Sequence, residues 1–154
     1  MAKVSPFLWF VGNMQEAVNF YVSVFKDARV VEMSPMSARF ELLGREFLAL
    51  NAHPHQPFTE AISFFVEVET QEEIDYYWER LGEGGDPAAQ ICGWLKDKFG
   101  VSWQIVPHEV YKLYEDADSP GARAAMEALM KMKKIDIAAL QEAYDNAEAA
   151  GVKH

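Results

Sequence analysis

The spacing of apolar residues along the chain predicts two amphipathic helices, each placed directly after an apolar strand. In residues 16–25 (EAVNFYVSVF) and 72–81 (EEIDYYWERL), apolar side chains recur with the i, i+3, i+7 spacing of one helix face. Residues 6–11 (PFLWFV) and 61–68 (AISFFVEV) precede these helices and have the length and composition of strands. The chain therefore carries the same strand–helix unit twice.

The two predicted helices also match residue by residue at a constant offset, which indicates a duplicated unit, although unrelated amphipathic helices share part of such a pattern. The matched pairs are Glu16/Glu72, Val18/Ile74, Asn19/Asp75, Phe20/Tyr76, Tyr21/Tyr77 and Phe25/Leu81. Strand-like segments follow both helices, with tight turns at Gly44 and Gly100. These segments are 29–33, 38–43 and 46–51 after the first helix, and 90–96 and 102–106 after the second.

These patterns predict an α+β fold in which two tandem βαβββ modules form a curved, eight-stranded mixed sheet around a cavity. The helices cover one face of that sheet, since a single helix cannot cover both. We expect the first module at residues 1–58, the second at 59–110 and a helical extension at 111–154, all within one compact unit.

The predicted extension contains two helices rich in Ala, Met and Leu, at residues 120–131 and 136–150. Pro120 lies near the start of the first helix, and Asp136 is the expected N-cap of the second. Packing against the modules or against a second subunit is the expected role of these helices, and a Met-rich binding lid is the alternative.

Charge and cysteine content narrow the classes of partner. The 154-residue chain has 24 acidic and 14 basic residues and a net charge of −10, which disfavours nucleic acid and anionic membranes. Cys92 is the only cysteine, so no internal disulfide can form, and this fits a reducing compartment. No stretch resembles a signal peptide or approaches the roughly 20 apolar residues of a membrane span. We therefore expect a cytoplasmic protein without nucleic-acid or membrane partners.

Several stretches resemble the PhnB-like branch of the vicinal oxygen chelate superfamily, which includes glyoxalases, bleomycin-resistance proteins and dihydroxybiphenyl dioxygenases. Members of this branch often carry the name 3-demethylubiquinone 3-methyltransferase. The chain, however, has no Gly-rich strand-to-helix turn of the kind that holds a nucleoside cofactor. The resembling stretches are 6–25 (PFLWFVGNMQEAVNFYVSVF), 47–54 (FLALNAHP), 92–107 (CGWLKDKFGVSWQIVP) and 131–143 (KMKKIDIAALQEA).

The resemblance also implies where a metal would lie in metal-dependent members, which hold a divalent ion with His and Glu from four strands. The corresponding positions in this chain are Pro6, Ala49, Ile62 or Ser63, and Gln104. None of these offers an imidazole or a carboxylate, the side chains that bind such ions. The sequence therefore predicts no metal and no other cofactor.

Three other features are candidates for chemistry. His53 and His55 form an H-x-H pair that can bind a metal, but the flanking Pro54 predicts loop histidines instead. Cys92 is either an inert buried thiol or a nucleophile whose nearest basic neighbour is Lys96. Glu67 is either a solvated acid at a strand end or a general base.

Strand alternation predicts which side chains line the cavity. With Gln104 pointing inward, Trp103 and Ile105 face the helices. With Ala49 and Pro6 inward, Asn51, Leu8 and Phe10 also point inward, whereas Phe7 and Trp9 face the first helix. On strand 61–68 the polar set is expected inward and Ile62, Phe64, Val66 and Val68 in the core, although the repeat offset favours the opposite orientation. The predicted ligand-binding residues are Phe10, Asn51, Ser63, Phe65, Glu67, Trp94 and Gln104.

An apolar cavity with two amides suits a small amphipathic or aromatic ligand, unless its aromatic side chains merely fill the sheet. We therefore predict a protein of the bleomycin-resistance type that binds such a molecule without a metal, and the resemblance implies a homodimer. The alternative is a metal-independent or unusual-metal lyase, isomerase or transferase that uses Cys92, Glu67 or the histidine pair. A third possibility is a structural domain that binds partners through its acidic C-terminal helices.

Overall fold

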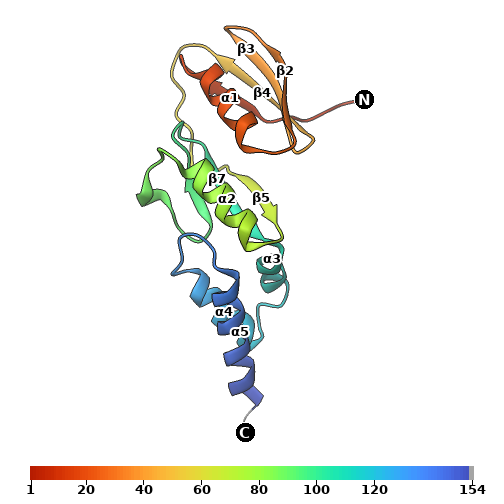
Figure 1. The fold of residues 1–154 in the computed structure, drawn as a ribbon, viewed down its shortest axis with the longest axis vertical. Helices are drawn as coiled ribbons and strands as arrows, with labels where there is room; N and C mark the ends of the chain where they lie inside the picture. The colour runs from red at the N-terminus through yellow and green to blue at the C-terminus, as the bar shows by residue number, and fades with distance from the viewer. Residues whose placement is uncertain (153–154) are drawn as a thin grey trace. The chain divides into compact units, whose positions relative to one another are not determined.

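The structure is a computed structural model that describes residues 1–152. The chain divides into two compact units, Met1–Phe58 and Thr59–His154, and each is described by itself. Both units contain a mixed sheet and helices (Figure 1), so the predicted α+β class is confirmed.

The first unit is a complete βαβββ module. Its sheet has the order β1-β4-β3-β2, in which β1 runs parallel to β4 and the other neighbours are antiparallel. Helix α1 packs on one face of this sheet. The elements are β1 (Phe7–Phe10), α1 (Met14–Val24), β2 (Ala28–Met33), β3 (Ser37–Leu42) and β4 (Arg45–Asn51).

The second unit repeats this topology with one strand fewer. Its sheet has the order β5-β7-β6, and β5 runs parallel to β7 as β1 does to β4. The elements of this module are β5 (Phe64–Val68), α2 (Gln71–Gly82), the 3-10 helix η1 (Pro87–Ala89), β6 (Trp94–Lys96) and β7 (Ser102–Pro107).

Eight strands were expected, and the structure has seven within residues 1–152. The segment between α2 and β6 forms η1 and irregular chain, and only an isolated bridge joins Ile91 to Trp94. Gly84, Gly85, Pro87 and Gly93 concentrate here, and these residue types disfavour a regular strand.

Three of the six pairs that the offset matches are buried in both units. Val18, Tyr21 and Phe25 are buried in the first unit, and their matched residues in the second unit are buried as well. Those residues are Ile74, Tyr77 and Leu81. The repeat is thus a repeat of core positions and not only of helical periodicity.

Three helices follow β7: α3 (His108–Glu115), α4 (Pro120–Leu129) and α5 (Ile137–Val152). Helix α4 begins where Ser119 Oγ accepts a hydrogen bond from the Ala122 amide at 3.0 Å. Asp136 Oδ1 accepts one from the Ala139 amide at 3.1 Å, the cap predicted for α5. Helices α4 and α5 lie side by side (Figure 1), whereas α3 was not predicted.

The extension is anchored to the second module by specific bonds before α5. The amides of Cys92 and Gly93 donate to the carbonyls of Met132 and Lys133 at 2.8 and 2.9 Å. The Gln71 side chain of α2 accepts from the Ile137 amide at 2.9 Å and donates to the Ile135 carbonyl at 3.0 Å. The side chain of Ile135 is fully buried, so this segment belongs to the core of the second unit.

No helix within residues 1–152 combines the length and the apolar composition that crossing a membrane requires.

Candidate functional site

Aromatic contacts identify which face of the first sheet the helix covers. The ring of Tyr21, in α1, stacks on Phe40 at a centroid distance of 6.4 Å, and Phe40 stacks on Phe47 at 5.3 Å. Strand alternation and register place Leu8 and Ala49 on the same side, and both are buried. The opposite face of this sheet is open.

This arrangement reverses the orientation expected for β1 and β4. Leu8 and Phe10 face the helix, whereas Phe7 is 55% exposed and lies with Leu48 on the open face. The sequence misled here because both faces of β1 are apolar, so alternation alone does not distinguish them.

Phe10 and Asn51 therefore do not lie on the open face as predicted. The Phe10 side chain is 3% exposed and packs edge-on against Phe58 at 5.4 Å. Asn51 Oδ1 accepts a hydrogen bond from the Gly12 amide, and its Nδ2 donates to the Pro35 carbonyl at 3.2 Å. Both side chains hold loops of the first unit together.

The open face of the first sheet has a cavity of about 300 Å³, whose lining includes Phe7, Arg39 and Leu48. Arg39 Nη1 donates to Glu46 Oε1 at 2.7 Å, and Lys3 Nζ lies 2.9 Å from the same oxygen. The hydrogen bond from Lys3, supported by the one from Arg39, lowers the pKa of Glu46. Glu46 is thus already paired with two basic side chains of the same unit.

On the second sheet, the predicted orientation is confirmed. Trp103 and Ile105 are buried on the helix side, as are Val66 and Val68, while Phe65 is 46% exposed on the other side. Ile62 is the exception, because β5 begins only at Phe64 and the Ile62 side chain is exposed.

Four of the predicted site residues meet on this open face. The register places Phe65, Gln104 and Trp94 in one row across β5, β7 and β6. Gln104 Nε2 donates to Ser63 Oγ at 2.9 Å. This row, together with Ser63, puts an amide between two aromatic side chains of adjacent strands.

The fifth predicted residue lies at one end of the same face. Glu67 pairs with Val106 in the sheet register, and its Oε1 lies 3.1 Å from His108 Nδ1 at the start of α3. The side chains of Glu67 and His108 are both more than half exposed. Sequence reasoning missed His108 because it follows the strand and takes no part in its alternation.

The candidate basic neighbour of Cys92 is bonded to another side chain, which removes the activation that a nucleophilic thiol needs. Cys92 lies in the turn before β6 with a φ of +52°, and its side chain is partly exposed instead of buried as expected. Lys96, its candidate basic neighbour, forms an ion pair with Glu60. The hydrogen bond from Lys96 lowers the pKa of the Glu60 carboxyl.

The residues on both open faces do not fit a divalent metal ion. The central positions hold apolar side chains on β1 and β4 and a hydroxyl, a phenyl and an amide in the second unit, at Ser63, Phe65 and Gln104. Among the described residues, no group of three or more His, Cys, Asp or Glu side chains is placed to hold an ion. His53 and His55 lie exposed in the loop between β4 and β5, as predicted for loop histidines.

A buried carboxylate that the sequence did not indicate supports the open face from below. Asp97 is buried after β6, and its Oδ1 accepts from the amides of Phe99 and Val101 at 2.8 and 3.0 Å. Its Oδ2 accepts from the indole N–H of Trp103 at 2.8 Å. Asp97 thus fixes the turn between β6 and β7 and the ring beneath the row.

Comparison with known proteins places this geometry in a family. Residues 2–106 match the family described as 3-demethylubiquinone-9 3-methyltransferase. The chain belongs to this family. The PhnB protein from Bacillus cereus is 35% identical with a TM-score of 0.61, covering 69% of this chain and 99% of that one. No curated protein sequence matches the chain.

More distant structures show the fold alone. The fosfomycin resistance protein FosX from Listeria monocytogenes, complexed with Mn(II) and sulfate, is 15% identical with a TM-score of 0.50, covering 68% of this chain and 91% of that one. A glyoxalase-related enzyme from Fulvimarina pelagi is 17% identical with a TM-score of 0.50, covering 71% and 91%. The fold is thus glyoxalase-like, as the resemblance implied.

Proposed function

We propose that the open face of the second sheet binds a small aromatic or amphipathic molecule without a metal ion, in the manner of a bleomycin-resistance protein. The observation that carries this proposal is the row Phe65–Gln104–Trp94. The exposed ring of Phe65 and the partly exposed ring of Trp94 supply apolar contact area, and an amide between them supplies polar selectivity.

The hydrogen bonding of the row defines the preferred ligand further. Gln104 donates through Nε2 to Ser63, so its Oε1 is directed to accept a bond from a ligand N–H or O–H. A phenol, an indole or a similar flat molecule with one donor matches this arrangement. The proposed site keeps Ser63, Phe65, Glu67, Trp94 and Gln104.

Metal independence is part of the proposal and rests on the donor set. A neutral amide and a hydroxyl bind divalent ions weakly, and Glu67 is already bonded to His108. The methyl transfer in the family's description is not part of the proposal. The turn after β1 has a single glycine, Gly12, and the turn after β5 has none, whereas nucleotide-binding turns are Gly-rich.

A thermal-shift and calorimetric screen tests the proposal on the full chain after EDTA treatment, with phenol, indole and 1-naphthol as probes. We expect saturable binding that Gln104→Ala and Trp94→Ala weaken about tenfold or more. Tyr111→Ala is the matched control, because it removes an exposed aromatic side chain that belongs to α3 and not to the row. Strong stabilisation by stoichiometric Ni²⁺ or Zn²⁺ that disappears in His53→Ala contradicts the proposal.

The pair Glu67–His108 favours one second candidate, a metal-independent lyase or isomerase. A carboxylate that orients an imidazole is a general-base arrangement, and it lies at the end of the proposed binding face. Substrate turnover that falls at least a hundredfold in both Glu67→Gln and His108→Asn, with probe binding retained, supports this candidate. Turnover that is unchanged in both variants excludes it.

We also propose that the chain forms a homodimer, as the resemblance implies, and that it is cytoplasmic, as its single cysteine suggests. We further propose that the two modules and the helical extension pack into one compact unit.

A further inference from the structure

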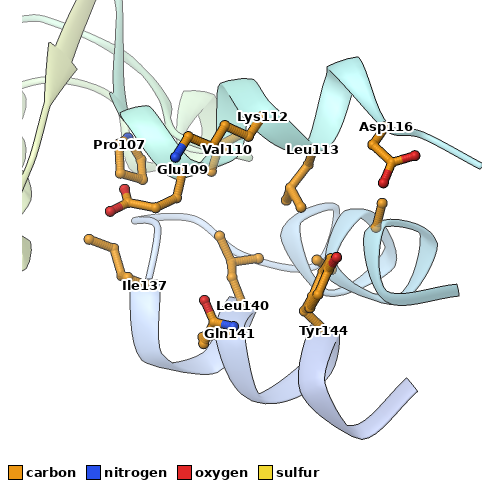
Figure 2. Close-up of a pocket in the computed structure, with 12 residues that line it drawn as sticks. Pro107, Glu109, Val110, Lys112, Leu113, Asp116, Ile137, Leu140, Gln141 and Tyr144 are labelled. Carbon is orange, nitrogen blue, oxygen red and sulfur yellow. The ribbon is translucent and has the colours of Figure 1, made fainter. Parts of the chain in front are cut away.

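A second cavity lies in the helical extension, beyond residue 106, where the match to the family ends. It has a volume of about 350 Å³ and lies between α3 on one side and α4 and α5 on the other (Figure 2). Small-molecule sites begin at about 300 Å³.

The inner wall of this cavity is apolar and buried. It includes Val110 from α3, Ala122 and Ala125 from α4, and Leu140 from α5, all of which are buried. The two alanines explain the space, because small side chains on α4 face α3 where larger ones would fill the gap. This wall suits the apolar body of a ligand.

The rim of the cavity is predominantly acidic. Glu109 and Asp116 stand at opposite ends of α3 with Lys112 between them, and Tyr144 faces them from α5 (Figure 2). None of the three charged residues forms an ion pair among the described residues. The rim carries two carboxylates against one ammonium, in a chain whose net charge is −10.

We propose that this cavity binds a small organic cation, an amine attached to an apolar or aromatic body. The body occupies the wall of Val110, Ala125 and Leu140, and the ammonium lies at the rim against one of the two carboxylates, which attract it. The site shares no residue with the row on the second sheet, so the inference stands apart from the proposed function.

A matched set of probes tests the proposal on the full chain: 4-phenylbutylamine, 4-phenylbutan-1-ol and 4-phenylbutanoate. These molecules share one body and differ in head-group charge. Isothermal titration calorimetry is expected to rank the amine first, with at least about tenfold higher affinity than the carboxylate and the alcohol between them. Added salt weakens the amine's affinity most, because its attraction is electrostatic.

Two kinds of variant locate the site. The double variant Glu109→Gln/Asp116→Asn is expected to lower amine affinity about tenfold and to leave the alcohol nearly unchanged. Glu115→Gln/Glu127→Gln makes the same change in net charge outside the lining and is the control. Ala125→Leu fills the cavity and abolishes binding of all three probes, and circular dichroism checks that this variant folds.

Equal affinity of the three probes, or no binding of the amine at millimolar concentration, overturns the proposal. Loss of amine affinity in the control pair to the same extent as in the rim pair also overturns it. NMR chemical shifts show whether the amine binds in this cavity or at the row on the second sheet. The amine must shift the methyl signals of Val110 and Leu140, and a shift confined to Trp94 and Gln104 places it elsewhere and contradicts the assignment.

Discussion

Adjacent residues of β1 have opposite surroundings, and this decides which face of the first sheet is open. Leu8 is 6% exposed beneath α1, whereas Phe7 is 55% exposed. We expect Leu8→Ala to lower the free energy of unfolding by about 2–4 kcal/mol, because it leaves a cavity in the core. Phe7→Ala is expected to cost less than about 1 kcal/mol in the same urea titration. The reverse order of the two losses contradicts the orientation.

Asp97 tests how far a single buried carboxylate supports the proposed binding face. Asp97→Ala leaves the Trp103 indole N–H and two backbone amides without their acceptor. Because unsatisfied buried donors are costly, we expect a loss of about 2–4 kcal/mol in unfolding free energy. Asp97→Asn is expected to be destabilising too, since its amide directs a donor at one of these N–H groups in either orientation. A stability within about 0.5 kcal/mol of the original chain in both variants contradicts this role.

At the scale of single residues, the sequence predicted the facing of side chains better for the second sheet than for the first. Alternation on β5 and β7 separates polar from apolar residues, so Phe65 and Gln104 could be assigned to one face. On β1 both faces are apolar, and the assignment failed for Phe10. The offset that aligns Val18 with Ile74 also aligns Phe10 with Val66, which faces the helix. The repeat offset and the polar alternation gave opposite orientations for strand 61–68. This conflict indicated that the inward face predicted for the first sheet was the wrong one.

At the scale of elements, the contact between the extension and the second module depends on Gly93. A Cβ atom there would lie 2.7 Å from Cδ1 of Ile135, and the backbone has a φ of +85°. Gly93→Ala therefore combines backbone strain with displacement of the anchoring segment. Gly44 has a φ of +80° with open space around it, so Gly44→Ala is the matched control for strain alone.

We expect Gly93→Ala to cost about 1–2 kcal/mol more than Gly44→Ala in chemical unfolding. Hydrogen exchange should also become faster at the amides of residues 92 and 93 in Gly93→Ala, since these amides donate to the carbonyls of Met132 and Lys133. Equal losses in the two variants, with unchanged exchange, show that the close contact with Ile135 is unimportant.

Element boundaries followed the sequence most clearly where periodicity and capping agreed. Helix α2 begins at a capping box of Thr70 and Glu73, and the amphipathic pattern starts at the same place. Helix α3 has only eight residues, too few for the apolar period to stand out, and it follows β7 without a loop. The strand missing before β6 was expected from the repeat, but the glycines and the proline of that segment override it.

At the scale of the whole molecule, duplication provides two similar sheets whose open faces differ in chemistry. The first presents aromatic and aliphatic side chains beside a self-paired Arg39 and Glu46, whereas the second presents an amide within an aromatic row. The helical extension lies beyond the family match and adds a separate cavity. Family membership could be read from motifs, whereas this cavity could not, because it depends on how three helices pack.

The proposed homodimer is a prediction at this scale. Sedimentation equilibrium is expected to give twice the 17.5 kDa mass of one chain at micromolar concentration. The control pair Glu115→Gln/Glu127→Gln indicates whether charge on the helical extension affects this mass. A single-chain mass over the whole accessible concentration range contradicts the homodimer.

We propose that the open face of the second sheet binds small aromatic molecules without a metal. An NMR titration of the EDTA-treated full chain with 1-naphthol tests it most directly, with the Trp94 indole N–H and the Gln104 side-chain amide as reporters. We expect saturable shifts of both signals, and in Gln104→Ala the shift of the Trp94 signal is lost or greatly weakened. Unmoved signals at millimolar probe, or shifts that appear only after Mn²⁺, Ni²⁺ or Zn²⁺ is added, contradict it.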